Sequence, residues 1–354
     1  MDDLQHDYPW TKNPLVIGAP MRLIALAALA TEISKAGGLG FIGAGSDTAN
    51  LQSILEEVKR SIADAPNLKN VKDVLPVGVG FICWAGQKLL KEALPSIEKY
   101  RPAAVWLFAP REHEDLVRWS EEVRRVTQGK TKIWIQVGTV ENAVEVTKSC
   151  QPDVLVVQGQ DAGGHGLHKA AGIIALLPEV DDTITALCKT ETIKKPALVA
   201  AGGIMDGRGA AAALTLGASG LVLGTRYLAS PEANIAEGYR QAVVEATDGG
   251  QMTERTKLYD QLRGTTDWPD EYGGRGVLNE SHTDAGKGMT FEENKRLYDE
   301  AMKTGDEGWG KNARLTTYAG TGVGLVREVK GAAAITEEMR EDAKTILRST
   351  SSKL

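Results

Sequence analysis

The stretches VAAGGIMDGRGA (199–210) and LVLGTRY (221–227) share one pattern. Each begins with a short apolar run, typical of a strand buried on both faces, and each then turns on glycine. In a doubly wound open sheet the glycine-rich turn should follow the first strand, whereas here the glycines gather after late strands. Glycine turns in these positions favour a (β/α)8 barrel, with the open sheet as the structural alternative.

Similar apolar runs recur along the first two thirds of the chain. With the two stretches above, the predicted strands are 15–20, 38–43, 75–82, 103–108, 132–137, 153–158, 196–202 and 220–225. Helical patterns separate them, near 24–37, 50–62, 113–127, 140–150 and 206–217. Strand–helix alternation over residues 1–245 predicts an α/β fold, the (β/α)8 TIM barrel.

The sequence changes character beyond this barrel. Residues 246–330 are polar, contain glycine turns and lack the rhythm of strands. They are predicted to form a smaller cap region beside the barrel mouth, with a helix near 291–304. Residues 331–354 are predicted to form a last helix, near 335–348, and a targeting tail.

The composition argues against several classes of function. The chain has 354 residues and a formal net charge of −6, which argues against nucleic acid or an anionic membrane as a partner. Cys83, Cys150 and Cys188 are far apart and lack metal-ligand spacing, so neither a disulfide framework nor a metal site is expected. Glycines interrupt the longest uncharged run, 209–225, which we interpret as core rather than as a membrane span.

The last three residues, Ser352, Lys353 and Leu354, have the form of the peroxisomal address. We therefore expect the protein to be imported into peroxisomes, with the import receptor that reads this tail as a partner. A chance match is the alternative.

Glycines after the last two predicted strands indicate a phosphate site. Gly202 and Gly203 follow the seventh strand, and Gly224 and Thr225 follow the eighth. In barrels these two loops commonly hold a phosphate, because glycine lets backbone N–H groups approach an anion closely. Thr225 can add a hydroxyl donor, and Asp206 is placed to cap the helix that follows. The alternative is that the glycines serve only tight turns.

His165 lies in VVQGQDAGGHG (156–166), directly after the sixth predicted strand. Gly163 and Gly164 beside it have no side chains, so they leave the imidazole accessible and leave room for a flat ligand. An imidazole in this position can take a proton near neutral pH. The alternative is a loop histidine that is hydrogen-bonded only to backbone.

Several motifs, in their order along the chain, resemble the nitronate monooxygenase family, formerly called 2-nitropropane dioxygenases, and its class I members in particular. The resemblance spans the predicted barrel and is looser at YAGTGVGLV (318–326). Its motifs are GAPM (18–21), AGGLGFIGAG (36–45), QGQDAGGHG (158–166), PALVAAGGIMDGRG (196–209) and GASGLVLGTRYLASPEA (217–233).

The resemblance implies that the barrel binds FMN non-covalently and that His165 is the catalytic residue. It implies a phosphate held by Gly202, Gly203, Gly224 and Thr225, an isoalloxazine ring lined by Ala19, Pro20 and Met21, and Gln158, Gly163 and Gly164 near that ring. The sequence departs from many relatives after GAPM, where Arg22 follows. Arg22 and Tyr318 are candidate substrate-binding residues, with an Arg22 that points to solvent as the alternative.

The implied activity is the FMN-dependent oxidation of alkyl nitronates by O2 to a carbonyl compound and nitrite, with propionate 3-nitronate as a candidate substrate. His165 would remove the α-proton of a neutral nitroalkane. The alternatives are an NAD(P)H-dependent flavin reductase of quinones or enoyl thioesters, a biosynthetic flavin oxidase, and a homologue that binds FMN without turnover. A homodimer is an assembly to be tested.

Overall fold

The computed structural model describes residues 3–352, and within them eight parallel strands close into a barrel. The order around the barrel is β1-β2-β3-β4-β5-β6-β8-β9, and β9 pairs with β1 to close it. The strands are β1 (Leu15–Gly18), β2 (Leu39–Gly45), β3 (Leu75–Ile82), β4 (Pro102–Phe108), β5 (Lys132–Val137), β6 (Val154–Gln158), β8 (Ala197–Ala201) and β9 (Gly220–Leu223). The predicted barrel and its eight strands are confirmed.

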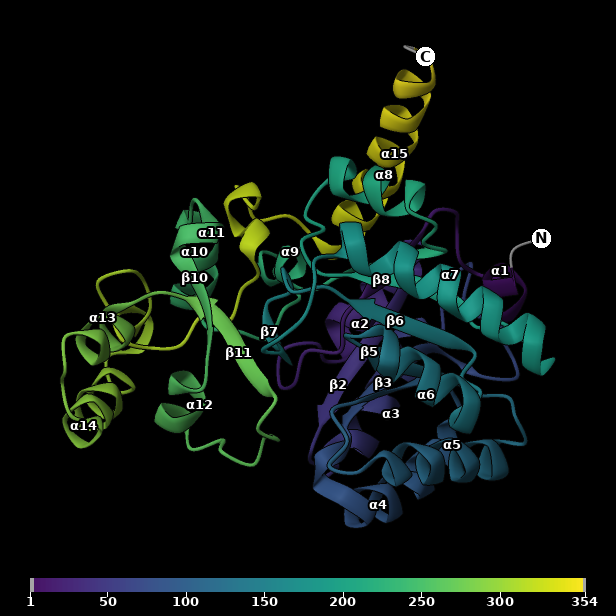
Figure 1. Ribbon diagram of the computed structural model, residues 1–354, viewed down its shortest axis with the longest axis horizontal. Coiled ribbons are helices and arrows are strands. Elements are labelled where there is room, and N and C mark those ends of the chain that lie inside the picture. Colours follow the sequence, from purple (N-terminus) through teal and green to yellow (C-terminus); the bar gives the residue numbers. More distant parts are fainter. Residues whose placement is uncertain (1–2, 353–354) are drawn as a thin grey trace.

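Helices alternate with these strands and cover the outside of the barrel (Figure 1). After a short first helix, α1 (Asp3–Asp7), they are α2 (Ala27–Lys35), α3 (Leu51–Ile62), α4 (Gly86–Tyr100), α5 (His113–Thr127), α6 (Val140–Cys150), α7 (Ile173–Glu191) and α8 (Gly207–Thr215). Asp206 caps α8 as predicted, because its carboxylate accepts from the N–H groups of Arg208 and Gly209 at 2.9 and 3.3 Å.

The helix that belongs to the eighth strand comes at the end of the chain. Only the short α9 (Thr225–Leu228) follows β9 directly, whereas α15 (Ala332–Ser351) packs against both α8 and α2 and so completes the ring. The buried guanidinium of Arg340 on α15 donates to the carbonyl oxygens of Ala36 and Gly37, at 3.3 and 2.9 Å. Lys353 and Leu354 of the predicted targeting signal lie outside the described residues.

Residues 229–331, called the insert below, separate α9 from α15 and lie beside the barrel (Figure 1, green to yellow). The elements of the insert are α10 (Glu237–Glu245), α11 (Gly249–Met252), β10 (Thr253–Thr256), α12 (Leu258–Arg263), β11 (Tyr272–Val277), α13 (Glu280–Gly286), α14 (Phe291–Ala301) and short 3-10 helices at Gly305–Gly308 and Thr321–Leu325. A further short 3-10 helix, Cys83–Ala85, follows β3.

The expectation that the region beyond 245 has no strands is wrong. β10 and β11 pair with each other, and β11 pairs with β7 (Gly164–Leu167), which lies in the connection after β6. β7 and β11 have the sequences GHGL and YGGRGV, which contain too much glycine for an apolar rhythm. This second sheet therefore joins the insert to the barrel segment that carries His165.

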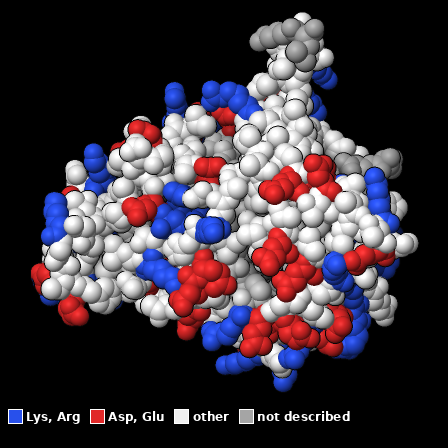
Figure 2. Space-filling view, viewed as in Figure 1, with Lys and Arg blue, Asp and Glu red and all other residues white. Residues whose placement is uncertain are grey.

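Basic and acidic side chains are interspersed over the face seen in Figure 2, and neither sign of charge covers it. Within residues 3–352, no helix combines the length and the apolar character needed to cross a membrane.

Candidate active site

The segment 19–21 lies next to two other parts of the barrel. An added Cβ atom on Gly80 of β3 would come within 2.3 Å of Pro20 Cβ. One on Gly224, at the end of β9, would be 3.7 Å from Ala19 Cβ and 4.0 Å from Met21 Sδ. The predicted ring-lining segment and the predicted phosphate residue Gly224 are therefore neighbours.

Backbone N–H groups are unpaired where β8 and β9 end. Gly202 and Gly203 have φ values of 105° and 77°, in the region that glycine adopts readily. β8 pairs with β9, so Gly224 lies at the adjacent strand end. The N–H groups of Gly202, Gly203 and Gly224 donate to no other group in the described part of the chain. These are donors that an anion such as a phosphate can use.

Thr225 and Gly163 both contact the segment around Gly320. The hydroxyl oxygen of Thr225 accepts from the Gly320 N–H at 3.0 Å, which leaves its own hydrogen free to donate. An added Cβ on Gly163 would lie 2.5 Å from the Gly320 nitrogen. The close packing of this segment explains why position 163 needs glycine.

His165 lies on β7 rather than in a plain loop. It is paired with Gly274 of β11, and its carbonyl oxygen accepts from the Gln158 side-chain amide at 3.2 Å. An added Cβ on Gly274 would be 2.6 Å from Tyr318 Cε1 and 3.4 Å from His165 Nε2. Glycine at 274 thus lets both side chains lie against the second sheet.

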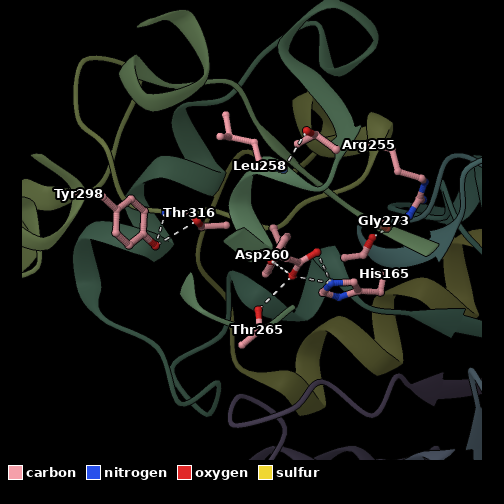
Figure 3. Close-up of polar contacts among 11 residues, drawn as sticks. His165, Arg255, Leu258, Asp260, Thr265, Gly273, Tyr298 and Thr316 are labelled. Carbon is pink, nitrogen blue, oxygen red and sulfur yellow. Dashed lines mark hydrogen bonds and ion pairs between the residues drawn. The ribbon is translucent and has the colours of Figure 1, made fainter. Parts of the chain in front are cut away.

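The imidazole of His165 is bonded to a carboxylate of the insert. His165 Nε2 lies 2.8 and 3.0 Å from the two carboxylate oxygens of Asp260, on α12 (Figure 3). An ionised carboxylate can only accept, so Nε2 carries the hydrogen of this bond. In the neutral ring the other nitrogen, Nδ1, then holds a lone pair and can act as a base.

Two hydroxyl groups also donate to Asp260. Its Oδ1 atom accepts from the Tyr318 hydroxyl at 3.0 Å and from the Thr265 hydroxyl at 3.1 Å. Burial and the nearby charge of Asp260 raise the pKa of Tyr318 well above its usual value, so the phenol stays protonated and remains a donor. Hydrogen bonds from His165, Tyr318 and Thr265 therefore fix the orientation of the Asp260 carboxylate.

Aromatic side chains surround the imidazole. The Trp268 ring lies parallel to the His165 ring, with centroids 3.7 Å apart and an interplanar angle of 5°. Trp268 also contacts Trp84, which follows β3, and Phe108, which ends β4, each with a centroid distance of 6.0 Å. The insert and two barrel strand ends thus form one wall beside His165.

Arg255 of β10 fixes the backbone that precedes His165 and the neighbouring strand β11. Its guanidinium donates to the carbonyl oxygens of Ala162, Gly164 and Gly273, at 2.8, 2.9 and 2.7 Å. Burial, together with the nearby Arg275, lowers the pKa of Arg255 to about 10, which still leaves the group charged at neutral pH.

Comparisons with known proteins identify the family. A model of the nitronate monooxygenase family matches residues 115–268. The nitronate monooxygenase npaC of Metarhizium robertsii is 47% identical to this chain, over 98% of this chain and 95% of its own length. The nitronate monooxygenase of Neurospora crassa is 39% identical, over 95% of this chain and 91% of its own. The chain belongs to the nitronate monooxygenase family.

Membership of this family makes the protein an oxidoreductase. Among solved structures, FabK from Thermotoga maritima superposes with a TM-score of 0.74 and 22% sequence identity, covering 99% of each chain. That similarity shows the barrel fold, which the family shares with other proteins.

The structure gathers most of the predicted site residues into two groups. Tyr318 and His165 meet at Asp260, while Gly224 lies beside Ala19 and Met21. The backbone of Arg22 pairs with Gly43 of β2, whereas its exposed side chain makes no hydrogen bond with any described residue and its carbons lie beside Gly45. Its role in substrate binding stays a prediction.

Sequence reasoning missed four side chains of this site: Asp260, Thr265, Trp268 and Arg255. All four belong to the insert, at least 90 positions after His165, in stretches such as KLYDQLR that match no motif. The one available signal was the glycine pattern GGRG (273–276). Glycines in a strand indicate that other side chains approach its backbone closely, as they do here.

Proposed function

We propose that the protein is an FMN-dependent nitronate monooxygenase that oxidises alkyl nitronates with O2 to a carbonyl compound and nitrite. The observation that carries this proposal is the His165–Asp260 pair, together with a set of unpaired backbone N–H groups at the carboxyl ends of β8 and β9. Family membership supports the reaction class.

The residues present fit FMN. The unpaired N–H groups of Gly202, Gly203 and Gly224 and the hydroxyl of Thr225 would hold the phosphate, and the segment 19–21 would line the ring. When bound, FMN would supply the electron acceptor of the reaction and the means to pass electrons to O2.

His165 has two roles in this proposal. With a neutral nitroalkane, the α-C–H bond breaks, the proton goes to Nδ1, and the electron pair stays on the substrate as its nitronate. With a nitronate already formed, a protonated imidazole beside Asp260 offers a hydrogen-bond donor and a positive charge to the anion. The wall of Trp268, Trp84 and Phe108 excludes water from one side.

Replacing Gly203 with Val is expected to lower FMN retention at least tenfold. Gly203 has a φ of 77°, which Val adopts only with strain, and an added Cβ would lie 3.1 Å from Asp161 Cβ. Released FMN per protein, measured by absorbance after denaturation, checks this result. Gly250→Val is the control, because open space surrounds that position. Full FMN content in a folded Gly203→Val protein would remove Gly203 from the phosphate site.

The proposed function is tested by mixing the purified protein anaerobically with a nitronate and, separately, with NADPH. We expect a change in the flavin spectrum with the nitronate, and nitrite release once O2 is admitted. Steady consumption of NADPH with a quinone or an enoyl thioester, without nitrite from the nitronate, would instead indicate a flavin reductase. A colourless protein that cannot be reconstituted with FMN would overturn the cofactor.

We further propose that the protein acts in peroxisomes, on the strength of Ser352-Lys353-Leu354. A fluorescent passenger that ends in these three residues is expected to co-localise with a peroxisomal marker. The same passenger with Leu354 removed is the control, and it should stay in the cytosol. A full-length fusion with a free tail that stays cytosolic would contradict the proposal.

A further inference from the structure

Asp260 is a buried carboxylate whose charged partner is an imidazole. No Lys or Arg of the described chain forms an ion pair with it, and its hydrogen-bond donors are His165 and the hydroxyls of Tyr318 and Thr265. A buried charge held in this way orients the groups that face it. Among these donors, only the His165 ring can carry its hydrogen on either of two nitrogens, so Asp260 can select its tautomer.

We propose that Asp260 is a positioning residue that holds His165 as the Nε2–H tautomer and so presents Nδ1 as the basic nitrogen to the substrate. This inference rests on the proposed role of His165 as the base for neutral nitroalkanes. In the other tautomer the hydrogen sits on Nδ1, and the lone pair faces Asp260, where no substrate can reach it.

The surroundings keep both partners of this bond in place. Hydroxyl donors reach Oδ1 of Asp260, so rotation of the carboxylate would break their hydrogen bonds. The parallel contact with Trp268 fixes the plane of the imidazole. Pairing of His165 with Gly274 fixes the backbone from which the ring projects.

Asp260→Asn tests the proposal, because it keeps the shape and removes the charge. The two hydroxyl donors favour the amide oxygen at the Oδ1 position, which places the NH2 group where Oδ2 stands, 3.0 Å from His165 Nε2. That NH2 group cannot accept from an Nε2–H and donates to Nε2 when this atom is unprotonated, whereas the amide oxygen at 2.8 Å still accepts from an Nε2–H, so the native tautomer loses its preference. Turnover of a neutral nitroalkane is expected to fall by about 10²-fold, the lower range for loss of a general base. Oxidation of a preformed nitronate needs no base, so it should fall by less than about tenfold.

A spectroscopic measurement separates positioning from a merely structural role. In protein labelled with 15N-histidine, the His165 signals, assigned by their absence in His165→Asn, should show a protonated Nε2 and an unprotonated Nδ1. Asp260→Asn should reverse or mix this pattern. Asp260→Glu keeps the carboxylate and should restore the native tautomer and part of the lost turnover.

Asp270→Asn is the matched control, since it makes the same chemical change on a fully exposed side chain of the insert. It should leave the tautomer and both activities unchanged. A wild-type protein with the hydrogen on Nδ1, or an unchanged tautomer in a folded Asp260→Asn protein, would overturn the inference. Failure of the proposed function is a separate outcome, because it would show as a wild-type protein that gives no flavin change and no nitrite with a nitronate, whatever tautomer the spectra report.

Discussion

His165→Asn is expected to slow turnover of a neutral nitroalkane by about 10²- to 10⁴-fold, the range for a lost general base. Asparagine keeps a similar size and a hydrogen-bond donor, yet it has no basic nitrogen at neutral pH. Oxidation of a preformed nitronate should survive in part, since that substrate has no α-proton to lose. FMN content should be unchanged, because the proposed phosphate donors are at the ends of β8 and β9.

Steady-state kinetics with a nitroalkane and its nitronate, on the same FMN-loaded protein, check this result. His113→Asn is the control, because His113 lies on α5, outside the barrel, and bonds to Ser149. Equal and modest losses on both substrates would mean that His165 only positions the ligand. Full activity on both would require another residue as the base.

Arg255→Met is expected to lower the free energy of unfolding by about 3 kcal/mol, because it removes hydrogen bonds from a charged donor to partly buried carbonyl oxygens. Methionine keeps the apolar stem but removes the hydrogen bonds to Ala162, Gly164 and Gly273. Those carbonyls belong to the segment before His165 and to β11, so turnover should also fall strongly. Arg255→Lys should recover only part of both losses, because an ammonium group cannot match the fork of a guanidinium.

Denaturant unfolding and turnover, measured on the same samples, check the expectation for Arg255. Arg125→Met is the control, since Arg125 is 65% exposed and pairs with Glu122 on the surface, where substitutions usually change stability by less than about 0.5 kcal/mol. A stable Arg255→Met protein with native turnover would show that the second sheet holds His165 without this arginine.

The barrel could be predicted from local sequence because its strands are buried on both faces. β3, β4 and β6 are continuous apolar runs, apart from Gln158 at the end of β6, and all but the last residue of each are buried. Such runs, with amphipathic helical segments between them, are typical of a parallel sheet covered by helices. The glycines at 202 and 203 were recognisable for a similar reason, since their positive φ is a local property of the backbone.

The second sheet and the eighth barrel helix follow from tertiary structure. β7 and β11 are short and rich in glycine, and β7 pairs only with β11, across more than 100 residues of sequence, while β11 pairs with β10 on its other side. α15 has an ordinary helical pattern, and only closure of the barrel places it between α8 and α2. Local propensity contains no information about either pairing.

By itself the sequence determined the barrel, the glycine turns and the identity of His165 as the residue to consider. Tertiary structure alone decided which nitrogen of that histidine is free, because Asp260 arrives from 95 positions further along the chain. The physical reason is that strand burial and glycine conformation are local, whereas a hydrogen bond between distant side chains depends on how the insert packs against the barrel. The chemistry proposed for His165 therefore depends on a neighbour that no motif in the sequence marks.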